Sequence, residues 1–353
     1  PVDKINWILS LQRLIIGGQI AEHSCKSNSF DEPLTVTNFN IKKASTQGSA
    51  PVESIEVDST GIYVQRGGSR VFELSFDPNK YDYTSKHLSA LVPEIGSPGI
   101  VRMAIQRQPD TRVHFVRSDG TVAVLIFDAT ENVACWLEAV SDGASGFVED
   151  VYVKPGEEGS DEDQVYYQVR RTINGSTVRY HEKWALESEC VGGDLCKIAD
   201  SFVTYTGTAE TTITGLSHLE GEEVVVWADG ADVGHDSSDA LIYTVSGGQI
   251  TLAEAASNVV VGLPYFSYWE SARLVQLQSQ VSVTLDSKKK IKGLGLIMAD
   301  VHRKGVKFGP DFTNMDDLPS MEAGEVVADD AMRADYNEDP FIFPGEWGVD
   351  ESL

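Results

Sequence analysis

The stretch VHFVRSDGTVAVLIF, residues 113–127, decides the fold. Apolar side chains alternate with other residues on both sides of Ser118-Asp119-Gly120, and this period of two is the pattern of a β-strand. An Asp-Gly pair between two alternating strands is among the strongest local signals of a β-hairpin, because glycine readily adopts the positive φ that tight turns require. The stretch therefore predicts a hairpin with its turn at Asp119-Gly120.

The same pattern occurs twice more, with turns roughly 50 residues apart. One copy has its turn at Gly67-Gly68, and the other has it at Asn174-Gly175. A period of about 50 residues that holds about four short strands is typical of propeller blades. We therefore predict an all-β protein built of β-propeller-like blades of antiparallel hairpins. The three repeats cover residues 51–84, 99–140 and 147–187.

Outside the repeats the strand pattern continues with other turns. Residues 7–16 and 34–41 are predicted strands around a polar loop at 22–33, and we interpret them as an earlier blade. Gly-rich turns between residues 202 and 268 separate short predicted strands at 202–205, 211–214, 223–228, 240–245, 249–252 and 259–262. They predict a small β-sandwich or barrel module inserted among the blades. The predicted domains are the blades (1–200), the inserted module (201–268), returning propeller strands (269–310) and an extended acidic segment (311–353).

The charge balance limits the possible partners of the chain. The sequence has 54 Asp and Glu against 28 Lys and Arg, a net charge of −26, which repels nucleic acid and anionic membrane surfaces. It contains no apolar run of about 20 residues, so we predict no membrane span. Because the chain opens on Pro1 inside an apolar strand pattern, we expect it to be a fragment or a processed product.

No arrangement of residues typical of catalysis is found. The seven histidines are scattered without metal-ligand spacing, and neither a G-x-S-x-G elbow nor a phosphate-binding glycine loop is present. The acidic run 155–163 lacks the order of a calcium loop, and Ser118-Asp119-Gly120-Thr121 departs from the Asp-box of sialidases. We expect free thiols at Cys190 and Cys196. We therefore predict no enzyme activity and no catalytic, cofactor-binding or metal-binding residues.

One aromatic cluster is a candidate binding feature. Tyr265, Phe266, Tyr268 and Trp269 follow the predicted module closely. Such a cluster is able to stack on sugar rings, to anchor a neighbouring subunit, or to pack at a domain junction, and the sequence leaves these alternatives open. The lysine cluster at 288–292 has no interleaved aromatic residues and is interpreted as a charged strand edge.

Several phrases together resemble one protein family. They follow one another along residues 5–300 and include LQRLIIGG (11–18), YVQRGG (63–68), QRQPD (106–110), RSDGT (117–121), VRRTING (169–175) and VVWADG (225–230). In this order they resemble the tail nozzle or hub (tail tube) proteins of short-tailed bacteriophages. The acidic segment after residue 311 has no counterpart in this resemblance.

The resemblance implies a structural virion protein that forms a closed ring, typically of six copies. It implies portal and adaptor proteins above the ring, tail fibres or spikes at its periphery, and a channel through which genomic DNA passes without sequence-specific binding. It places the protein in the phage tail, assembled in the bacterial cytoplasm. An acidic lumen agrees with this role, because it does not hold passing DNA. The alternative is a carbohydrate-binding or carbohydrate-cleaving β-propeller, either a lectin or a receptor-recognition protein.

Overall fold

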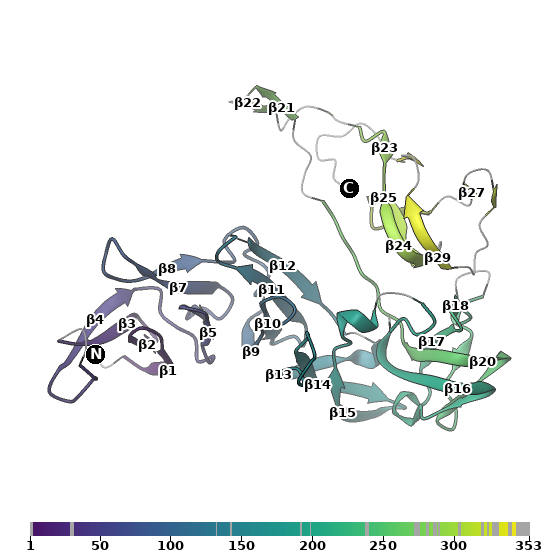
Figure 1. Ribbon diagram of the computed structural model, residues 1–353, viewed down its shortest axis with the longest axis horizontal. Coiled ribbons are helices and arrows are strands. Elements are labelled where there is room, and N and C mark those ends of the chain that lie inside the picture. Colours follow the sequence, from purple (N-terminus) through teal and green to yellow (C-terminus); the bar gives the residue numbers. More distant parts are fainter. Residues whose placement is uncertain are drawn as a thin grey trace. The chain divides into compact units, whose positions relative to one another are not determined.

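In the computed structural model in Figure 1, the regular structure of the described residues is β-strands with three short 3-10 turns, and this confirms the predicted all-β fold. Contacts divide the chain into two compact units, residues 1–184 and 185–353. The structure describes residues 3–28, 32–131, 133–141, 143–190, 193–197, 199–236, 240–271, 276–279, 282–284, 288, 290–302, 305–318, 321–322, 325–326, 332–337 and 341–343.

The first unit contains four consecutive antiparallel sheets, each with its strands in chain order. Sheet 1 is β1 (Ile5–Ser10), β2 (Leu14–Gly18), β3 (Glu22–Ser27) and β4 (Phe39–Ser45); sheet 2 is β5 (Ile55–Val57), β6 (Thr60–Val64), β7 (Val71–Asp77) and β8 (Asp82–His87). Sheet 3 is β9 (Ile100–Gln106), β10 (Arg112–Arg117), β11 (Val122–Asp128) and β12 (Val133–Ala139), and sheet 4 is β13 (Phe147–Lys154), β14 (Gln164–Ile173) and β15 (Ser176–Lys183).

Each pair of consecutive sheets encloses its own apolar core. Because successive side chains of a strand point to opposite faces, one strand contributes to two cores. In β10, Val113 and Phe115 pack in the core shared with sheet 2, whereas the adjacent Val116 packs in the core shared with sheet 4. In β6, Tyr63 packs towards sheet 1 and its neighbours Ile62 and Val64 pack towards sheet 3. Alternating apolar residues therefore stack the sheets face to face.

A backbone hydrogen bond recurs between consecutive sheets. The turn between the second and third strand of one sheet accepts a bond from the chain at or near the start of the next sheet. Gly18 O accepts from Ser49 N at 2.9 Å, Gly68 O accepts from Ile100 N at 2.7 Å, and Gly120 O accepts from Val148 N at 2.9 Å. The first strands of neighbouring sheets also contact each other, β1 with β5, β5 with β9, and β9 with β13. This repeated arrangement is propeller-like.

All three predicted turns join paired antiparallel strands, but they are of two kinds. Asn174 and Gly175 both have positive φ, 46° and 73°, and connect strands paired directly at Ile173 and Ser176. In the other two turns only the second residue is left-handed, Gly68 at 82° and Gly120 at 85°. Those two turns are longer loops, and each of them ends on a single left-handed glycine.

The predicted boundaries near the N-terminus need correction. The single strand expected over 7–16 is two strands, β1 and β2, and the polar loop expected at 22–33 begins with strand β3. The prediction assigned polar residues to a loop, but Glu22 and Ser24 are polar strand residues that are buried between sheets 1 and 2. Glu22 accepts a hydrogen bond from the Ser49 hydroxyl at 2.8 Å, which lets its carboxylate lie inside.

The second unit contains a five-stranded sheet in the region predicted as the inserted module. Its order is β16 (Asp200–Thr214), β20 (Gln249–Leu263), β17 (Glu223–Ala228) and β18 (Ala231–Asp232), with β19 (Tyr243–Thr244) paired to β17. The strands expected at 202–205 and 211–214 are one continuous β16, and those expected at 249–252 and 259–262 are one β20. Register shifts between β16 and β20 interrupt the regular alternation, so each long strand looks like two in the sequence.

Short strand pairs follow this sheet. They are β21 (Gln276–Ser279) with β22 (Ser282–Thr284), β23 (Gly293–Leu294) with β30 (Phe341–Ile342), β24 (Ile297–His302) with β29 (Met332–Asn337), β25 (Lys307–Asp311) with β26 (Asn314–Asp317), and β27 (Met321–Glu322) with β28 (Glu325–Val326). Parts of the acidic segment predicted as extended thus pair with strands at 293–302. The domain boundaries at 200, 268 and 310 stay predictions.

Candidate functional site

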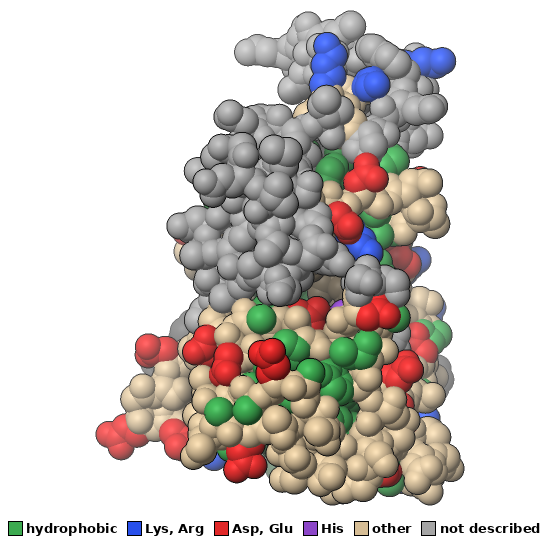
Figure 2. All heavy atoms as spheres, turned by 90° about the vertical axis from the view of Figure 1, so that its right-hand side faces the viewer, with side chains coloured by type: hydrophobic (Ala, Val, Ile, Leu, Met, Phe, Trp, Pro, Cys, Tyr) green, Lys and Arg blue, Asp and Glu red, His purple; other side chains and the backbone are tan. Residues whose placement is uncertain are grey.

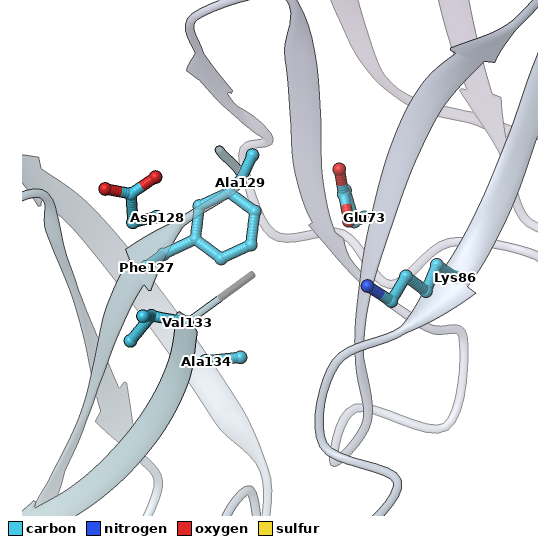
Figure 3. A pocket seen from close by; sticks show the side chains of 7 residues that line it. All are labelled: Glu73, Lys86, Phe127, Asp128, Ala129, Val133 and Ala134. Carbon is cyan, nitrogen blue, oxygen red and sulfur yellow. The ribbon is translucent and has the colours of Figure 1, made fainter. Parts of the chain in front are cut away.

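A small cavity lies between sheets 2 and 3 (Figure 3). In the view of Figure 3, Lys86 reaches from β8 towards β11 and β12, and the Phe127 ring points from β11 towards β7. The cavity has a volume of about 70 Å³, room for about two water molecules and far below the size of ordinary ligand pockets. Its lining is Glu73, Lys86, Phe127, Asp128, Ala129, Val133 and Ala134.

The most unusual group in this cavity is Glu73. It faces Lys86 across the strand pair but is only 6% exposed. Burial raises the pKa of the Glu73 carboxyl, and the positive charge of Lys86 opposes that rise. A raised pKa beside a lysine is a feature of some catalytic sites, yet it also occurs in structural ion pairs. The cavity is too small to hold a sugar ring beside these groups.

A second polar cluster is buried between sheets 3 and 4. His114 is fully buried; its Nδ1 lies 2.7 Å from the Tyr167 hydroxyl and its Nε2 lies 3.2 Å from Oε1 of Gln106. Burial, and secondarily the charge of Arg112, lowers the pKa of His114 to about 4, so its imidazole is neutral at pH 7. The Trp184 ring packs against it, with centroids 5.3 Å apart. The neutral His114 is hydrogen-bonded through both ring nitrogens, one to each sheet, and so helps to fix sheets 3 and 4 relative to each other.

Two buried arginines, at corresponding positions in sheets 3 and 4, also hold neighbouring parts of the chain together. Arg171 is fully buried, forms a bidentate pair with Glu182 at 2.7 Å for both bonds, and donates to Gly143 O at 2.6 Å. Arg117, the corresponding residue of sheet 3, pairs with Glu138 and donates to Ile95 O at 3.2 Å. Each guanidinium therefore ties the last strand of its sheet to the loop that leads into that sheet. Buried guanidinium groups whose N–H donors all have acceptors favour one arrangement of the strands and loops that they join.

The predicted aromatic cluster forms an exposed surface of the second unit. The exposed fractions are 41% for Tyr265, 79% for Phe266, 64% for Tyr268 and 73% for Trp269. The Tyr268 ring contacts Phe312 edge-on, with centroids 5.1 Å apart, and Phe312 is itself 48% exposed. We call these five residues the aromatic platform. Their exposure argues against packing within the described part of the chain and leaves sugar stacking or subunit contact.

The stretch of chain that contains the platform residues 265–269 is acidic. Between Lys197 and Arg273 the sequence contains eleven Asp and Glu and neither Lys nor Arg. On the face seen in Figure 2, red carboxylate side chains surround a group of green hydrophobic side chains in the lower part. Hydrogen bonds, first from the Thr313 hydroxyl and next from Asn314, lower the pKa of Asp311 beside the platform to about 2. This surface therefore repels polyanions at neutral pH.

The other sequence motifs have local structural roles. Asp119 accepts hydrogen bonds from the Thr121 amide at 3.1 Å and hydroxyl at 2.6 Å, which closes the hairpin turn. Asp163, in the acidic loop, accepts from the amides of Arg107 at 2.7 Å and Gln108 at 3.1 Å. Among the described residues no three His, Cys, Asp or Glu side chains gather as metal ligands, and no helix is long and apolar enough to cross a membrane. Lys289 lies outside the described residues.

Sequence reasoning missed the buried carboxylates Glu22, Glu73 and Asp163. For Glu73 a signal existed, because it occupies an inward position of the alternating strand VFELSFD. For Asp163 none existed, because two of its three amide partners, Arg107 and Gln108, are more than 50 residues away, and only Gly156 is in its own loop.

No protein-family model matches the chain, and a search of curated proteins finds no match to it.

Proposed function

We propose that this chain is a structural subunit of a bacteriophage tail nozzle or hub, assembled as a closed ring around a channel for genome passage. The observation that carries the proposal is the ordered series of phrases that resemble nozzle proteins. In the described structure these phrases lie at turns: residues 63–68 lead into the β6–β7 turn, 117–121 form the β10–β11 turn, and 169–175 enter the β14–β15 turn.

The character of the polar groups supports a scaffold role. The buried guanidinium groups of Arg117 and Arg171 pair with Glu138 and Glu182 and tie strands to loops, and His114 is held neutral between two sheets. The one cavity described above holds about two waters. A net charge of −26 supports a channel wall that DNA passes without pausing, since stable contact with phosphates requires Lys and Arg.

The mass and shape of the purified protein test this proposal. We expect a particle several times 38.5 kDa, ring-shaped in negative-stain images, with a central channel whose wall is acidic. A particle without a channel, or a channel wall dominated by Lys and Arg, would overturn it.

A second candidate is a carbohydrate-binding protein, and the aromatic platform favours it, because exposed tyrosine and tryptophan rings stack on sugars. A glycan array distinguishes the two functions. Binding of a defined glycan by a monomer, lost in Trp269→Ala, would support the lectin function, whereas a ring that binds no glycan supports the nozzle.

A further inference from the structure

Sheet 1 has one face against which no other described sheet of the first unit packs. The pairings Ile8 with Ile16, Ile16 with His23, and His23 with Lys43 place these four residues in one row on that face. By the two-residue period of a strand, Ile41 and Phe39 of β4 share the face with Lys43. The exposed fractions are 59% for Ile8, 44% for Phe39 and 49% for Ile41. Leu14 and Ile41 both pair with Cys25, which shares this face and is 0% exposed. We call the surface formed by Ile8, Leu14, Ile16, Phe39, Ile41 and Lys43 the open face.

The corresponding faces of the later sheets are all covered. Sheet 2 packs Tyr63 and Leu74 against sheet 1, and sheet 3 packs Phe115 against sheet 2; each of these side chains is 0% exposed. The opposite side of sheet 1 is also covered, since Trp7 and Ile15 pack against sheet 2. The open face therefore has apolar residues as a packed sheet face does, but Ile8, Phe39 and Ile41 on it remain exposed.

The charge of sheet 1 differs from that of the rest of the chain. Lys43 is exposed on the open face, whereas the adjacent Lys42, which pairs with Ser24, is exposed on the opposite side of β4. Glu22, the single carboxylate of β1–β4, is fully buried and belongs to the row of Gly17, on the covered side with Trp7. In a chain of net charge −26, the open face thus combines apolar residues with the positive charge of Lys43, and the described strands of sheet 1 place no carboxylate on it.

The aromatic platform has the complementary properties. It presents five half-exposed or exposed rings, and four of them belong to the stretch between Lys197 and Arg273, in which carboxylates are not balanced by Lys or Arg. Ring faces attract lysine ammonium groups, and a carboxylate such as that of Asp311, next to Phe312, attracts them further. Apolar area and opposite charge therefore match between the open face and the platform.

We propose that the open face of one copy binds the aromatic platform of a second copy of this chain. The proposal rests on the ring assembly proposed above and names its interface. Because two different surfaces meet, the contact is heterologous, and a pair of copies retains one free open face and one free platform. Repeating such a contact closes a ring when the rotation between copies allows it.

Two half-defective variants test the interface. Ile41→Asp/Lys43→Glu disrupts the open face and leaves the platform intact, whereas Phe266→Asp/Trp269→Ala disrupts the platform and leaves the open face intact. All four positions are exposed, so both variants should retain the far-ultraviolet circular dichroism of the wild type. The control is Leu91→Asp/Lys80→Glu, which makes the same kinds of change at sites 97% and 67% exposed in the same unit as the open face.

Mass photometry at micromolar concentration measures the result. We expect the wild type and the control to assemble, and each half-defective variant alone to remain at 38.5 kDa. An equal mixture of the two variants should form a dimer of twice that mass, because one intact open face then meets one intact platform.

The other possible outcomes would contradict either the proposed interface or the proposed ring. Variants that assemble as the wild type does would overturn the interface and leave the ring proposal standing. A mixture that stays monomeric would show that the two surfaces do not bind each other. A wild type that never assembles would overturn both the interface and the ring.

Discussion

The carbonyl oxygen of Gly120 accepts a hydrogen bond from the amide of Val148 at 2.9 Å, which joins the hairpin turn of sheet 3 to the first strand of sheet 4. Gly120 has a φ of +85°, and a Cβ placed there would lie 2.4 Å from the Phe147 ring. The glycine therefore satisfies two requirements at once. It permits the left-handed backbone of the turn, and it leaves room for the aromatic residue that begins the next sheet.

We expect Gly120→Ala to destabilise the first unit by about 2–4 kcal/mol, the sum of left-handed backbone strain and overpacking against Phe147. Gly175→Ala is the matched control. Gly175 has a similar φ of +73°, but no atom lies within 4 Å of the added Cβ, so only the strain of about 1–2 kcal/mol remains. Urea unfolding followed by fluorescence measures both. Equal losses in the two variants would contradict the role of the Phe147 contact.

Arg171→Met should cost about 3–5 kcal/mol in unfolding free energy, because it leaves the carboxylate of Glu182 without its partner in a largely buried position. The double variant Arg171→Met/Glu182→Met should recover part of that loss, since no uncompensated charge remains. The control is Arg179→Met, which removes a similar bidentate pair with Glu149 at the surface and should cost at most about 1 kcal/mol. A double variant less stable than Arg171→Met would be inconsistent with this account.

The stability of the first unit should fall on acidification because of His114. Its pKa is about 4 in the folded protein against an ordinary 6.5, so the unfolded chain binds the proton more readily. The contribution is fully present above pH 6.5 and is lost as the pH falls towards 4, by about 3 kcal/mol at most. Thermal melts between pH 7 and pH 4 measure this. His114→Gln should flatten the profile in that window, while the exposed His181→Gln should leave it unchanged.

Glu73→Gln should stabilise the protein at pH 7. Burial raises the pKa of Glu73, so the folded state favours the neutral form, and its stability decreases as the pH rises from the unfolded pKa through the folded one. Glutamine keeps the shape without the charge. The difference in melting temperature between the variant and the wild type should be positive at pH 7 and should shrink below pH 4. A variant that is less stable at pH 7 would show that Lys86 compensates the charge fully.

The hairpins of this protein are determined locally. Period-two alternation and the turns at Gly68, Gly120 and Gly175 require only neighbouring residues to specify paired strands, and the structure has strands and turns at those places. The exposure of Phe266 and Trp269, in contrast, was one of several alternatives, because an aromatic run has the same sequence whether it is packed or exposed.

The sequence by itself determined the strand class, the turn positions and the acidic character, since each depends on backbone preference or on a sum of charges. Only the tertiary structure decided which faces are covered. Tyr63 and Ile8 are both apolar strand residues, yet one is 0% and the other 59% exposed, because a neighbouring sheet covers the first and not the second. Likewise, Asp163 becomes a buried acceptor only because folding brings it to amides 55 and 56 residues away. Alternation specifies two faces for every strand, but long-range packing decides what each face contacts.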